Sequence, residues 1–450
     1  MTRLRPVRRA DPRSAAAAAL SFVFPGLGQG YNRRWLLAVL LAIPVVLLIG
    51  LGTVAVASGG SGLISRLLDA RVLVALVILN LALLGWRLVA ILQAHADRQR
   101  LTARAWPTWV TAGLVVITLG MHALPAYYAV KAIDTLGSVS LEGGGALFDE
   151  RVGRDIDIPE PSDQPDLELH ERVTVLLLGI DFAPGRDHHL TDTMLVASID
   201  PRTGEGALVS VPRDLYGTPL GDGRVYNAKL NSLMSVAADD PATYPLGGPG
   251  TLKAAVGALL GTRIHYFAAI DIEGMRQVID IIGGVDVVVE RTIDDPRYFD
   301  SLTGQRGFYL DAGPRHLDGA TAMAYARSRQ GAGDDDFTRA ERQQHLLTAI
   351  ADKLTAGNLL VTLPGLLDAV RDNMATDIPS GRLPLLAAEA EGADLGSLDR
   401  VVLQPPEHVT PMSDPVAGYV LVPNLDAILA LGADVFGDGR SERPDAPHSQ

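Results

Sequence analysis

Three long apolar runs in the first third of the chain constrain the fold more than any other feature of the sequence. Trp35–Ser58 contains no charged residue, Val72–Ala94 contains only Arg87, and Ala105–Val130 contains none. A helix needs about 20 apolar residues to cross a bilayer, and each run is long enough. The runs predict membrane spans at residues 35–58, 72–94 and 105–130. The alternative, three buried helices of a soluble protein, is disfavoured by the length of the runs.

A fourth apolar stretch, Ala15–Gly30, is shorter and is interrupted by Pro25 and three glycines. Arginines in short loops stay in the cytoplasm, so their positions indicate the topology. Ten of them fall on the cytoplasmic side if this stretch does not cross: Arg3, Arg5, Arg8, Arg9, Arg13, Arg33, Arg34, Arg98, Arg100 and Arg104. We therefore expect a cytoplasmic basic N-terminus (1–14) and a membrane region (15–130) whose residues 15–30 are re-entrant or interfacial. Everything after Val130 is expected outside the cytoplasm, and the absence of a cleavage site followed by soluble sequence argues against a signal peptide.

The charges of the two parts differ in sign. Residues 1–130 carry 13 basic and 3 acidic residues, whereas residues 131–450 carry 26 basic and 49 acidic residues. Binding to nucleic acid requires a basic face, so the acidic globular part argues against a nucleic-acid partner. The chain contains no cysteine, which excludes disulfides, thiolate zinc sites and cysteine nucleophiles. Any metal must be held by oxygen or imidazole ligands.

Strands and helices alternate in the exported part. Residues 131–171 are acidic and rich in glycine and proline, which predicts an extracytoplasmic linker, and residues 436–450 have the composition of a disordered tail. Between them, residues 172–435 contain short apolar strand patterns, among them VTVLLLGI, MLVASID, ALVSVPRD, HYFAAID and VDVVVE, and helical patterns that include Gly319–Ser328 and Thr338–Leu354. The alternation predicts a layered α/β/α domain with a central mixed sheet.

Charged side chains gather at the ends of the predicted strands. Asp181 ends the VTVLLLGI strand, Asp192 precedes MLVASID, and Arg213 with Asp214 ends ALVSVPRD. Ligands of open α/β sheets bind beyond the carboxyl ends of strands, so a site is expected there. Two carboxylates without histidine or cysteine suit a hard cation such as Mg²⁺, which prefers few carboxylates together with phosphate oxygens.

The segment YARSRQGAGDDDFTRAERQQHLL, at residues 325–347, adds four arginines: Arg327, Arg329, Arg339 and Arg342. Arg339 and Arg342 share one helix face because they lie three residues apart. Converging guanidiniums match phosphate oxygens, and together with a metal they describe a pyrophosphate clamp. Two structural alternatives remain. Asp336, just before the helix, can serve only as its N-cap, and the arginines can form a salt-bridge network with Asp334–Asp336.

These motifs resemble the LytR-CpsA-Psr family of bacterial cell-envelope proteins. The resemblance covers residues 172–435 and is carried in order by LLLGID, TDTM, SVPRD, KLN, IIGGVDV, LDGATAMAYARSR and DFTRAERQQ. It implies a membrane-anchored phosphotransferase that moves a glycopolymer phosphate from a polyprenyl-pyrophosphate carrier to peptidoglycan. A hydrolase acting on the same lipid-linked donor, or a non-enzymatic regulatory or lipid-sensing membrane protein, is the alternative.

The resemblance also implies roles for individual residues. Asp181 and Asp192 are expected to hold Mg²⁺, while Arg213, Arg327, Arg329 and Arg339 clamp the pyrophosphate oxygens. Asp336 is expected to act as a base, Lys229, Arg342 and Gln343 to bind substrate, and a long apolar groove to hold the lipid tail. Two positions depart from the family pattern: Leu190 stands where an arginine is common, so Arg186 is expected to reach in from the loop, and Gln330 stands where histidine is common.

Overall fold

The computed structural model describes residues 11–57, 69–97, 106–139, 172–181, 190–300, 302–331, 333–354, 356–379, 382–383, 385–386 and 398–437. The chain divides into two compact units, Met1–Asp134 and Thr135–Gln450. The predicted linker beyond residue 139, the loop with Arg186 and the predicted tail beyond residue 437 lie outside the described residues.

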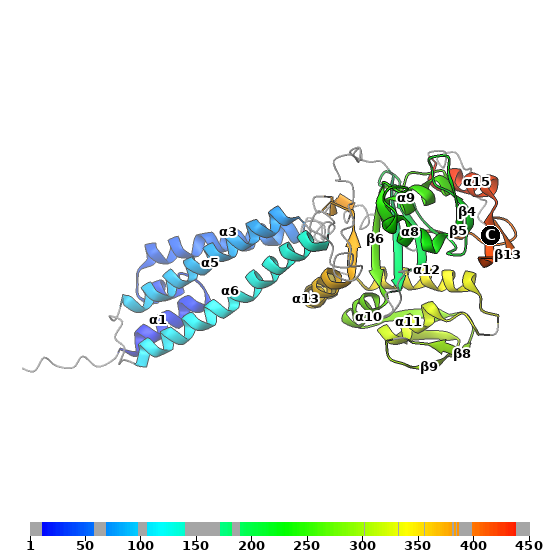
Figure 1. The fold of residues 1–450 in the computed structure, drawn as a ribbon. Helices are drawn as coiled ribbons and strands as arrows, with labels where there is room; N and C mark the ends of the chain where they lie inside the picture. The colour runs from blue at the N-terminus through cyan, green and yellow to red at the C-terminus, as the bar shows by residue number, and fades with distance from the viewer. Residues whose placement is uncertain are drawn as a thin grey trace, which may run out of the picture. The chain divides into compact units, whose positions relative to one another are not determined.

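Three helices of the described N-terminal part are long and apolar enough to cross a membrane. They are α3 (Trp35–Ala57), α5 (Ala70–Ala96) and α6 (Trp106–Val139) (Figure 1). The predicted apolar helical region is therefore present. However, α6 continues past the predicted end of the third span at Val130. Lys131 and Asp134 end the apolar run without breaking the helix, because a charged residue lowers hydropathy but is compatible with helical backbone.

The shorter fourth stretch folds as a helical hairpin, α1 (Pro12–Val23) and α2 (Leu27–Tyr31). Pro25 and Gly26 separate the two helices, and Gly26 has a positive φ of 102°. A side chain at Gly26 would also collide with the carbonyl oxygen of Ala38, at 2.3 Å from an ideal Cβ. Only glycine allows both this backbone conformation and this approach to α3.

Polar contacts hold the hairpin against α5. Arg87 donates to the carbonyl of Phe22 at 2.6 Å, Gln29 donates to that of Ala90 at 2.8 Å, and Asn32 donates to that of Ala94 at 2.9 Å. From Phe22 to Asn32 the chain thus moves along α5 toward its C-terminal end. Gly28 packs directly on α1, since an added Cβ would lie 2.0 Å from the carbonyl oxygen of Ala17. The helix α2 therefore lies against α1, and the chain reverses direction between them.

The second unit is built on a mixed six-stranded sheet of order β11-β6-β1-β2-β3-β12. Its centre is β1 (Val173–Asp181), which pairs antiparallel with β2 (Leu190–Ile199) and parallel with β6 (Tyr266–Asp271). On the far side of β2 lie β3 (Gly206–Ser210), antiparallel, and β12 (Asp399–Val402), parallel to β3. The other edge is β11 (Met374–Thr376), antiparallel to β6. The predicted mixed sheet is confirmed.

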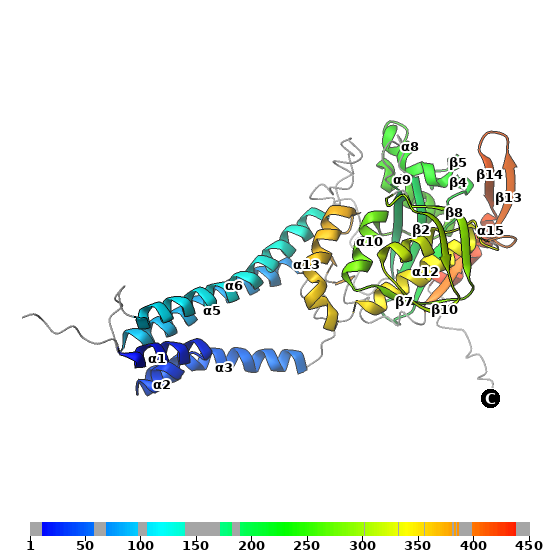
Figure 2. The same cartoon turned by 90° about the horizontal axis from the view of Figure 1, so that it is seen from below.

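Helices cover both faces of this sheet (Figures 1 and 2). On one face, Leu176, Leu178 and Val209 are buried in a cluster with residues of α8 (Leu233–Asp239), α9 (Gly247–Leu260) and α15 (Leu425–Phe436). Neighbouring side chains of a strand point to opposite faces, so Ser210 faces the other way. There it accepts a hydrogen bond from Gln344 of α12 (Asp336–Lys353) at 2.8 Å. The predicted α/β/α layering is therefore present.

A second apolar cluster lies beside the sheet. It combines α10 (Ile272–Ile281) and α11 (Gly319–Arg327) with two two-stranded sheets, one of β7 (Val285–Val289) and β10 (Gly313–Leu317), the other the hairpin of β8 (Ile293–Phe299) and β9 (Arg306–Leu310). Leu346 and Ile350 extend α12 into this cluster, while Phe337 near its start packs on the first. The helix α12 thus packs against both apolar clusters. These contacts hold its N-terminus at the end of the sheet. The remaining elements are η3 (Leu230–Ser232), α13 (Ala356–Asn373), β4 (Tyr216–Pro219), β5 (Val225–Lys229), β13 (Val409–Asp414) and β14 (Gly418–Pro423).

Candidate active site

A β-bulge presents Asp192. Along β1 and β2, Gly179 lies opposite Thr193 and Ile180 lies opposite Thr191, so Asp192 is the extra residue between two pairs. A bulge bends its strand and re-aims the inserted side chain. Gly179 permits this arrangement, because an added Cβ there would lie 2.9 Å from the Cβ of Thr193. The glycine of the LLLGID motif is thus required by the packing of the opposite strand.

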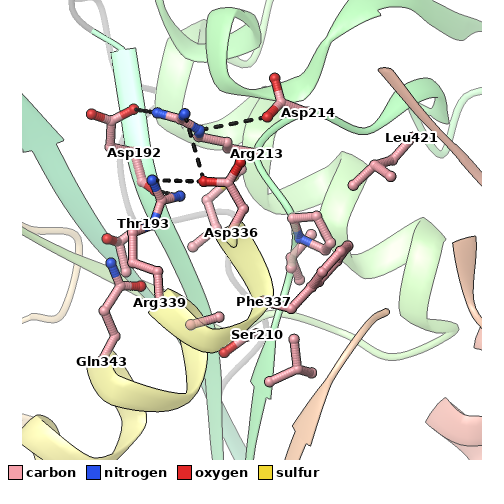
Figure 3. Close-up of a pocket in the computed structure, with 15 residues that line it drawn as sticks. Asp192, Thr193, Ser210, Arg213, Asp214, Asp336, Phe337, Arg339, Gln343 and Leu421 are labelled. Carbon is pink, nitrogen blue, oxygen red and sulfur yellow. Dashed lines mark hydrogen bonds and ion pairs between the residues drawn. The ribbon is translucent and has the colours of Figure 1, made fainter. Parts of the chain in front are cut away.

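Arg213 lies in the loop after β3 and is the centre of the site. Its Nη1 lies 2.6 Å from Oδ1 of Asp192, and its Nη2 lies 3.7 Å from Oδ1 of Asp336. Its Nε lies 3.6 Å from Oδ2 of Asp214, which also pairs with Lys229 at 2.7 Å. One guanidinium therefore meets three carboxylates from three different segments (Figure 3).

The N-terminus of α12 supplies Asp336 and Arg339. The N-cap is Asp335, whose carboxylate accepts the backbone N–H groups of Phe337 and Thr338, and Thr338 completes a capping box. The alternative in which Asp336 is only an N-cap is therefore wrong. Because its neighbour takes that role, Asp336 faces the arginines, and its Oδ1 lies 2.9 Å from Nη1 of Arg339. Whether Asp335 or Asp336 is the N-cap decides which carboxylate faces the arginines. The sequence alone contains no signal that distinguishes these two consecutive aspartates.

The segment after α11 brings in Arg329. Its Nη1 lies 3.5 Å from Oδ1 of Asp336. The turn is ordered by Asp295 of β8, whose Oδ2 accepts the hydroxyl of Ser328 and the backbone N–H groups of Arg329 and Gln330, at 2.8, 3.1 and 3.1 Å. Asp295 was not among the predicted residues. Its position in a β-hairpin far along the chain gave no indication of this contact.

Of the remaining predicted site residues, Gln343 lines the pocket and Arg327 is not among the residues that line it. A buried Nη1 of Arg327 makes no hydrogen bond within the described part of the chain. Arg327 is close enough to Tyr298 to act on the pKa of its hydroxyl, although burial is the larger cause and raises it. Gln343 donates to the carbonyl of Ala326 at 3.3 Å.

Arg342 has different partners. Its Nη2 lies 3.3 Å from Oδ2 of Asp334 and donates to the carbonyl of Ser328 at 2.7 Å, and its guanidinium lies 5.7 Å from the centre of the Tyr325 ring. Asp334 also pairs with Arg291 at 2.9 Å. The segment that looked like one charge cluster thus forms two. Asp334 belongs to a structural network with Arg342, and Asp336 belongs to the site with Arg339.

Burial and the nearby carboxylates have opposite effects on the pKa values of the two buried arginines, Arg213 and Arg339. Burial lowers the pKa of the Arg339 guanidinium, since it outweighs the nearby carboxylate of Asp336. Arg213 is also buried, but Asp192 and Asp336 overcome that effect and its pKa lies above the ordinary value. The Nε atoms of both arginines are buried without a hydrogen-bond partner among the described residues. Unsatisfied buried donors are costly, and here they point to a site for an oxyanion.

A small pocket joins these groups. It is lined by Asp192, Thr193, Met194, Ser210, Val211, Pro212, Arg213, Asp214, Asp336, Phe337, Arg339, Ala340, Gln343, Val402 and Leu421, and most of its polar side chains are visible in Figure 3. Its internal volume of about 30 Å³ has room for little more than water. The buried charges therefore pair mostly with one another.

Asp181, the other predicted metal ligand besides Asp192, is placed by its backbone alone. Asp181 ends β1 opposite Leu190, the residue that replaces the common family arginine. The side chain of Asp181, like Arg186, lies outside the described residues. Within the described part, no group of three or more His, Cys, Asp or Glu side chains is placed to hold a metal.

The fold and the site together define a class: a mixed α/β domain that gathers arginines and carboxylates around a small pocket beyond the strand ends, in a chain that also contains a region of apolar helices. The sequence profile of the LytR_cpsA_psr family matches residues 150–407, and the chain belongs to that family. The predicted family membership is confirmed.

Similar proteins include two named as polyisoprenyl-teichoic acid–peptidoglycan teichoic acid transferase TagU. That of Enterococcus faecalis is 30% identical over 232 residues, which cover 51% of this chain and 69% of that protein. That of Oceanobacillus iheyensis is 28% identical over 305 residues, covering 66% and 84%. Among solved structures, B. subtilis TagV has a TM-score of 0.46 with 23% identity over 60% of this chain and 98% of its own. The structure described as TagT bound to LIIa-WTA has a TM-score of 0.46 with 19% identity, covering 62% and 98%.

Proposed function

We propose that this protein transfers a glycopolymer phosphate from a polyprenyl-pyrophosphate carrier to peptidoglycan, forming a phosphodiester in the cell wall. The relatives named as teichoic acid–peptidoglycan transferases support the reaction class. The observation that carries the proposal is the buried pair Arg213 and Arg339, which both contact Oδ1 of Asp336 and both have unsatisfied Nε donors among the described residues. Such a pair binds phosphate oxygens strongly in a site that excludes water.

The residues divide the work of phosphoryl transfer. The guanidiniums of Arg213, Arg329 and Arg339 bind the pyrophosphate oxygens and stabilise the charge that grows on the departing polyprenyl phosphate. Asp336 accepts the proton of the acceptor hydroxyl. The acceptor oxygen forms its bond to the phosphorus of the glycopolymer phosphate as the bond from that phosphorus to the bridging oxygen breaks. The bridging oxygen and its electron pair leave with the polyprenyl phosphate.

Substrate binding requires rearrangement of the ion pairs. A pyrophosphate is larger than the present pocket, and Asp192 occupies the Nη1 donor of Arg213. We infer that the anion takes the place of the Asp192 carboxylate on Arg213. Asp192 is then available to a cation, which couples the two binding events.

We propose Mg²⁺ as the cation, held by Asp192 and Asp181. The two residues belong to adjacent strands at the bulge, and Mg²⁺ typically takes one or two carboxylates with phosphate oxygens as further ligands. The donor set, all oxygen, fits this ion. When bound, it neutralises charge on the pyrophosphate.

We also propose that the protein is a multi-pass protein of the cell membrane with its catalytic domain outside the cytoplasm. Three helices long and apolar enough to span a membrane support this. A lipid-linked donor is then confined to the membrane that anchors the enzyme.

The test is a reconstitution of the full-length protein in lipid nanodiscs. Polyprenyl-pyrophosphate glycopolymers are added with and without peptidoglycan, and the products are identified by mass spectrometry. We expect a phosphodiester-linked product that requires peptidoglycan and is lost with EDTA and in Asp192→Ala. Release of the glycopolymer phosphate at the same rate without peptidoglycan would instead identify a hydrolase. Absence of any turnover with all donors would support a non-enzymatic role.

A further inference from the structure

The hairpin β13–β14 forms one wall of the pocket. It lies after residue 407, where the family match ends. The backbone N–H of Leu421 donates to the carbonyl of Asp214 at 2.9 Å, and Leu421 forms an isolated parallel bridge with Leu215. Leu421 is buried and lines the pocket. The hairpin is thus fixed by its backbone to the loop that carries Arg213.

The outer part of the hairpin projects from the domain (Figure 2) and exposes apolar side chains. Met412, Val416 and Tyr419 are 42%, 97% and 52% exposed. Asp414 is the only charged residue in the hairpin, and its Oδ1 accepts the backbone N–H groups of Val416 and Ala417, which fixes the turn. Exposed strand edges usually carry charges that prevent association. An ordered, almost uncharged hairpin beside an active site has the properties of a binding surface.

Of these three exposed residues, Tyr419 is the one that lies on the same strand as Leu421. It is two residues from Leu421 on β14, so both side chains project to the same face, about 7 Å apart along the strand. The face that lines the pocket with Leu421 therefore continues outward to Tyr419. Partial burial and the carboxylates of Asp336 and Asp214 raise the pKa of the Tyr419 hydroxyl. The ring thus lies within electrostatic range of the proposed base and keeps its phenolic proton.

We propose that Tyr419 binds a sugar ring of the acceptor glycan and thereby brings the acceptor hydroxyl to Asp336. The inference rests on the proposed function and deepens it. Pyranose rings have apolar C–H faces and polar rims, and an exposed tyrosine offers a flat apolar face with little loss of side-chain entropy. The arginines occupy the part of the site that binds the pyrophosphate. The acceptor must approach the phosphorus opposite the leaving oxygen, and Asp336 must reach its hydroxyl.

The donor glycopolymer is also a carbohydrate, so the experiment separates the two sources. Full-length protein in nanodiscs is assayed with the donor varied at saturating peptidoglycan glycan, and the glycan varied at saturating donor. In Tyr419→Ala we expect the KM for the glycan to rise roughly tenfold, the strength of one aromatic contact, and the KM for the donor to stay within twofold. Tyr419→Phe keeps the ring and should restore the KM for the glycan.

Tyr309→Ala is the matched control. Tyr309 is 62% exposed on β9, and its hydroxyl donates to Asp311 at 2.8 Å. We expect both KM values to be unchanged. A rise in the KM for the donor alone in Tyr419→Ala would overturn the proposal and assign the ring to the donor. Unchanged KM values would overturn it as well.

A second measurement does not depend on turnover. Soluble peptidoglycan glycan strands without donor are titrated into the full-length protein by calorimetry. Binding that is weakened in Tyr419→Ala, but not in Tyr309→Ala or Tyr419→Phe, supports the proposal. Equal binding by all four proteins contradicts it. If the unsubstituted protein binds glycan but transfers nothing from any donor, the proposed function fails while the glycan site stands.

Discussion

Arg339 and Arg342 lie three residues apart on α12, yet their surroundings give them different roles. Arg339 is held beside Asp336 and Arg213 and has a buried Nε without a partner among the described residues. Arg342 is paired with the buried Asp334 and bonded to the carbonyl of Ser328. Arg342 also has a buried Nη1 without a partner among the described residues, but its Nη2 is used by Asp334 and by the carbonyl of Ser328. The two arginines are therefore matched probes of chemistry and stability.

We predict that Arg339→Ala lowers the transfer rate by roughly 10² or more, as expected for removal of one preorganised donor. Its melting temperature should change little, because the substitution also relieves repulsion from Arg213. Arg339→Lys should lose most activity too, since lysine keeps the charge but not the two-pronged geometry. Transfer rates and melting curves of the purified variants test this. A large loss of stability with normal activity in the folded fraction would assign Arg339 to the structure instead.

Arg342→Ala should show the opposite behaviour. Removing one partner of a buried pair leaves Asp334 without its buried cation, which costs on the order of 3–5 kcal/mol of the free energy of unfolding. Arg291, the other partner of Asp334, is 48% exposed and compensates only partly. Denaturant unfolding gives the stability, and transfer assays below the melting temperature give the activity. If Arg342→Ala is stable but inactive, Arg342 belongs to the substrate site after all.

The sequence predicted that arginines and aspartates gather at the site. It did not predict which aspartate pairs with which arginine. Strand-end positions indicated Asp192 and Arg213, and the structure brings these two together at 2.6 Å. The partition of Asp334–Asp336 into a structural ion pair, a cap and a site residue was not predictable. Consecutive aspartates have equal propensities, and the partition depends on where α12 begins and which arginine each carboxylate can reach.

Among the elements, the β1–β2 bulge positions Asp192. Gly179→Ala should force Thr193 and the inserted Asp192 to move, with a loss of about 1–3 kcal/mol and a loss of transfer. The test is a double-mutant cycle of stability with Thr193→Gly. That change should cost less in the Gly179→Ala background than in the unsubstituted protein, because it removes the collision. Strictly additive effects would show that the two residues do not collide.

The capping box at the start of α12 gives a second prediction at this scale. Asp335→Ala removes the acceptor of the Phe337 and Thr338 N–H groups and should cost about 1 kcal/mol. Transfer should fall modestly, since Asp336 and Arg339 lie in the turn that the cap fixes. Asp336→Ala should instead abolish transfer with a smaller loss of stability. Thermal unfolding and rate measurements on both variants distinguish the roles, and equal effects in both would remove Asp336 from the chemistry.

Long, strongly patterned elements were predicted well, and exposed hairpins were not. The apolar runs of β1, β2 and β6 and the helix α12 follow from periodicity. β13–β14 contains Pro411 and Pro415 and alternates weakly, so no local pattern indicates that it borders the site. Its position depends on contacts with distant parts of the chain, among them the backbone pairing of Leu421 with Leu215 and the burial of Val409 and Leu421 in the first cluster, and these are properties of the tertiary structure.

At the scale of the whole molecule, the distribution of arginines and the α1–α2 hairpin bear on the same question. Ten arginines lie on one side of the membrane only if residues 15–30 do not cross it. Within the first unit, the hairpin returns along α5, and Arg34 lies 3.4 Å from Asp97 at the end of that helix. A segment that enters and returns at one end of α5 has the geometry of a re-entrant element. The side chains of Gln29, Asn32 and Arg87 donate hydrogen bonds to backbone carbonyls within this unit, partners that lipid cannot supply.

We therefore predict that four positions alternate across the membrane. Because the chain has no cysteine, single substitutions Thr2→Cys, Ser61→Cys, Gln99→Cys and Ser140→Cys can be labelled in intact cells with a membrane-impermeant maleimide. Ser61→Cys and Ser140→Cys should react in intact cells, and Thr2→Cys and Gln99→Cys only after permeabilisation. Labelling of Thr2→Cys from outside, with the other three unchanged, would mean that residues 15–30 cross. Protection of Ser140→Cys would place the catalytic domain in the cytoplasm, away from peptidoglycan, and would contradict the proposed function itself.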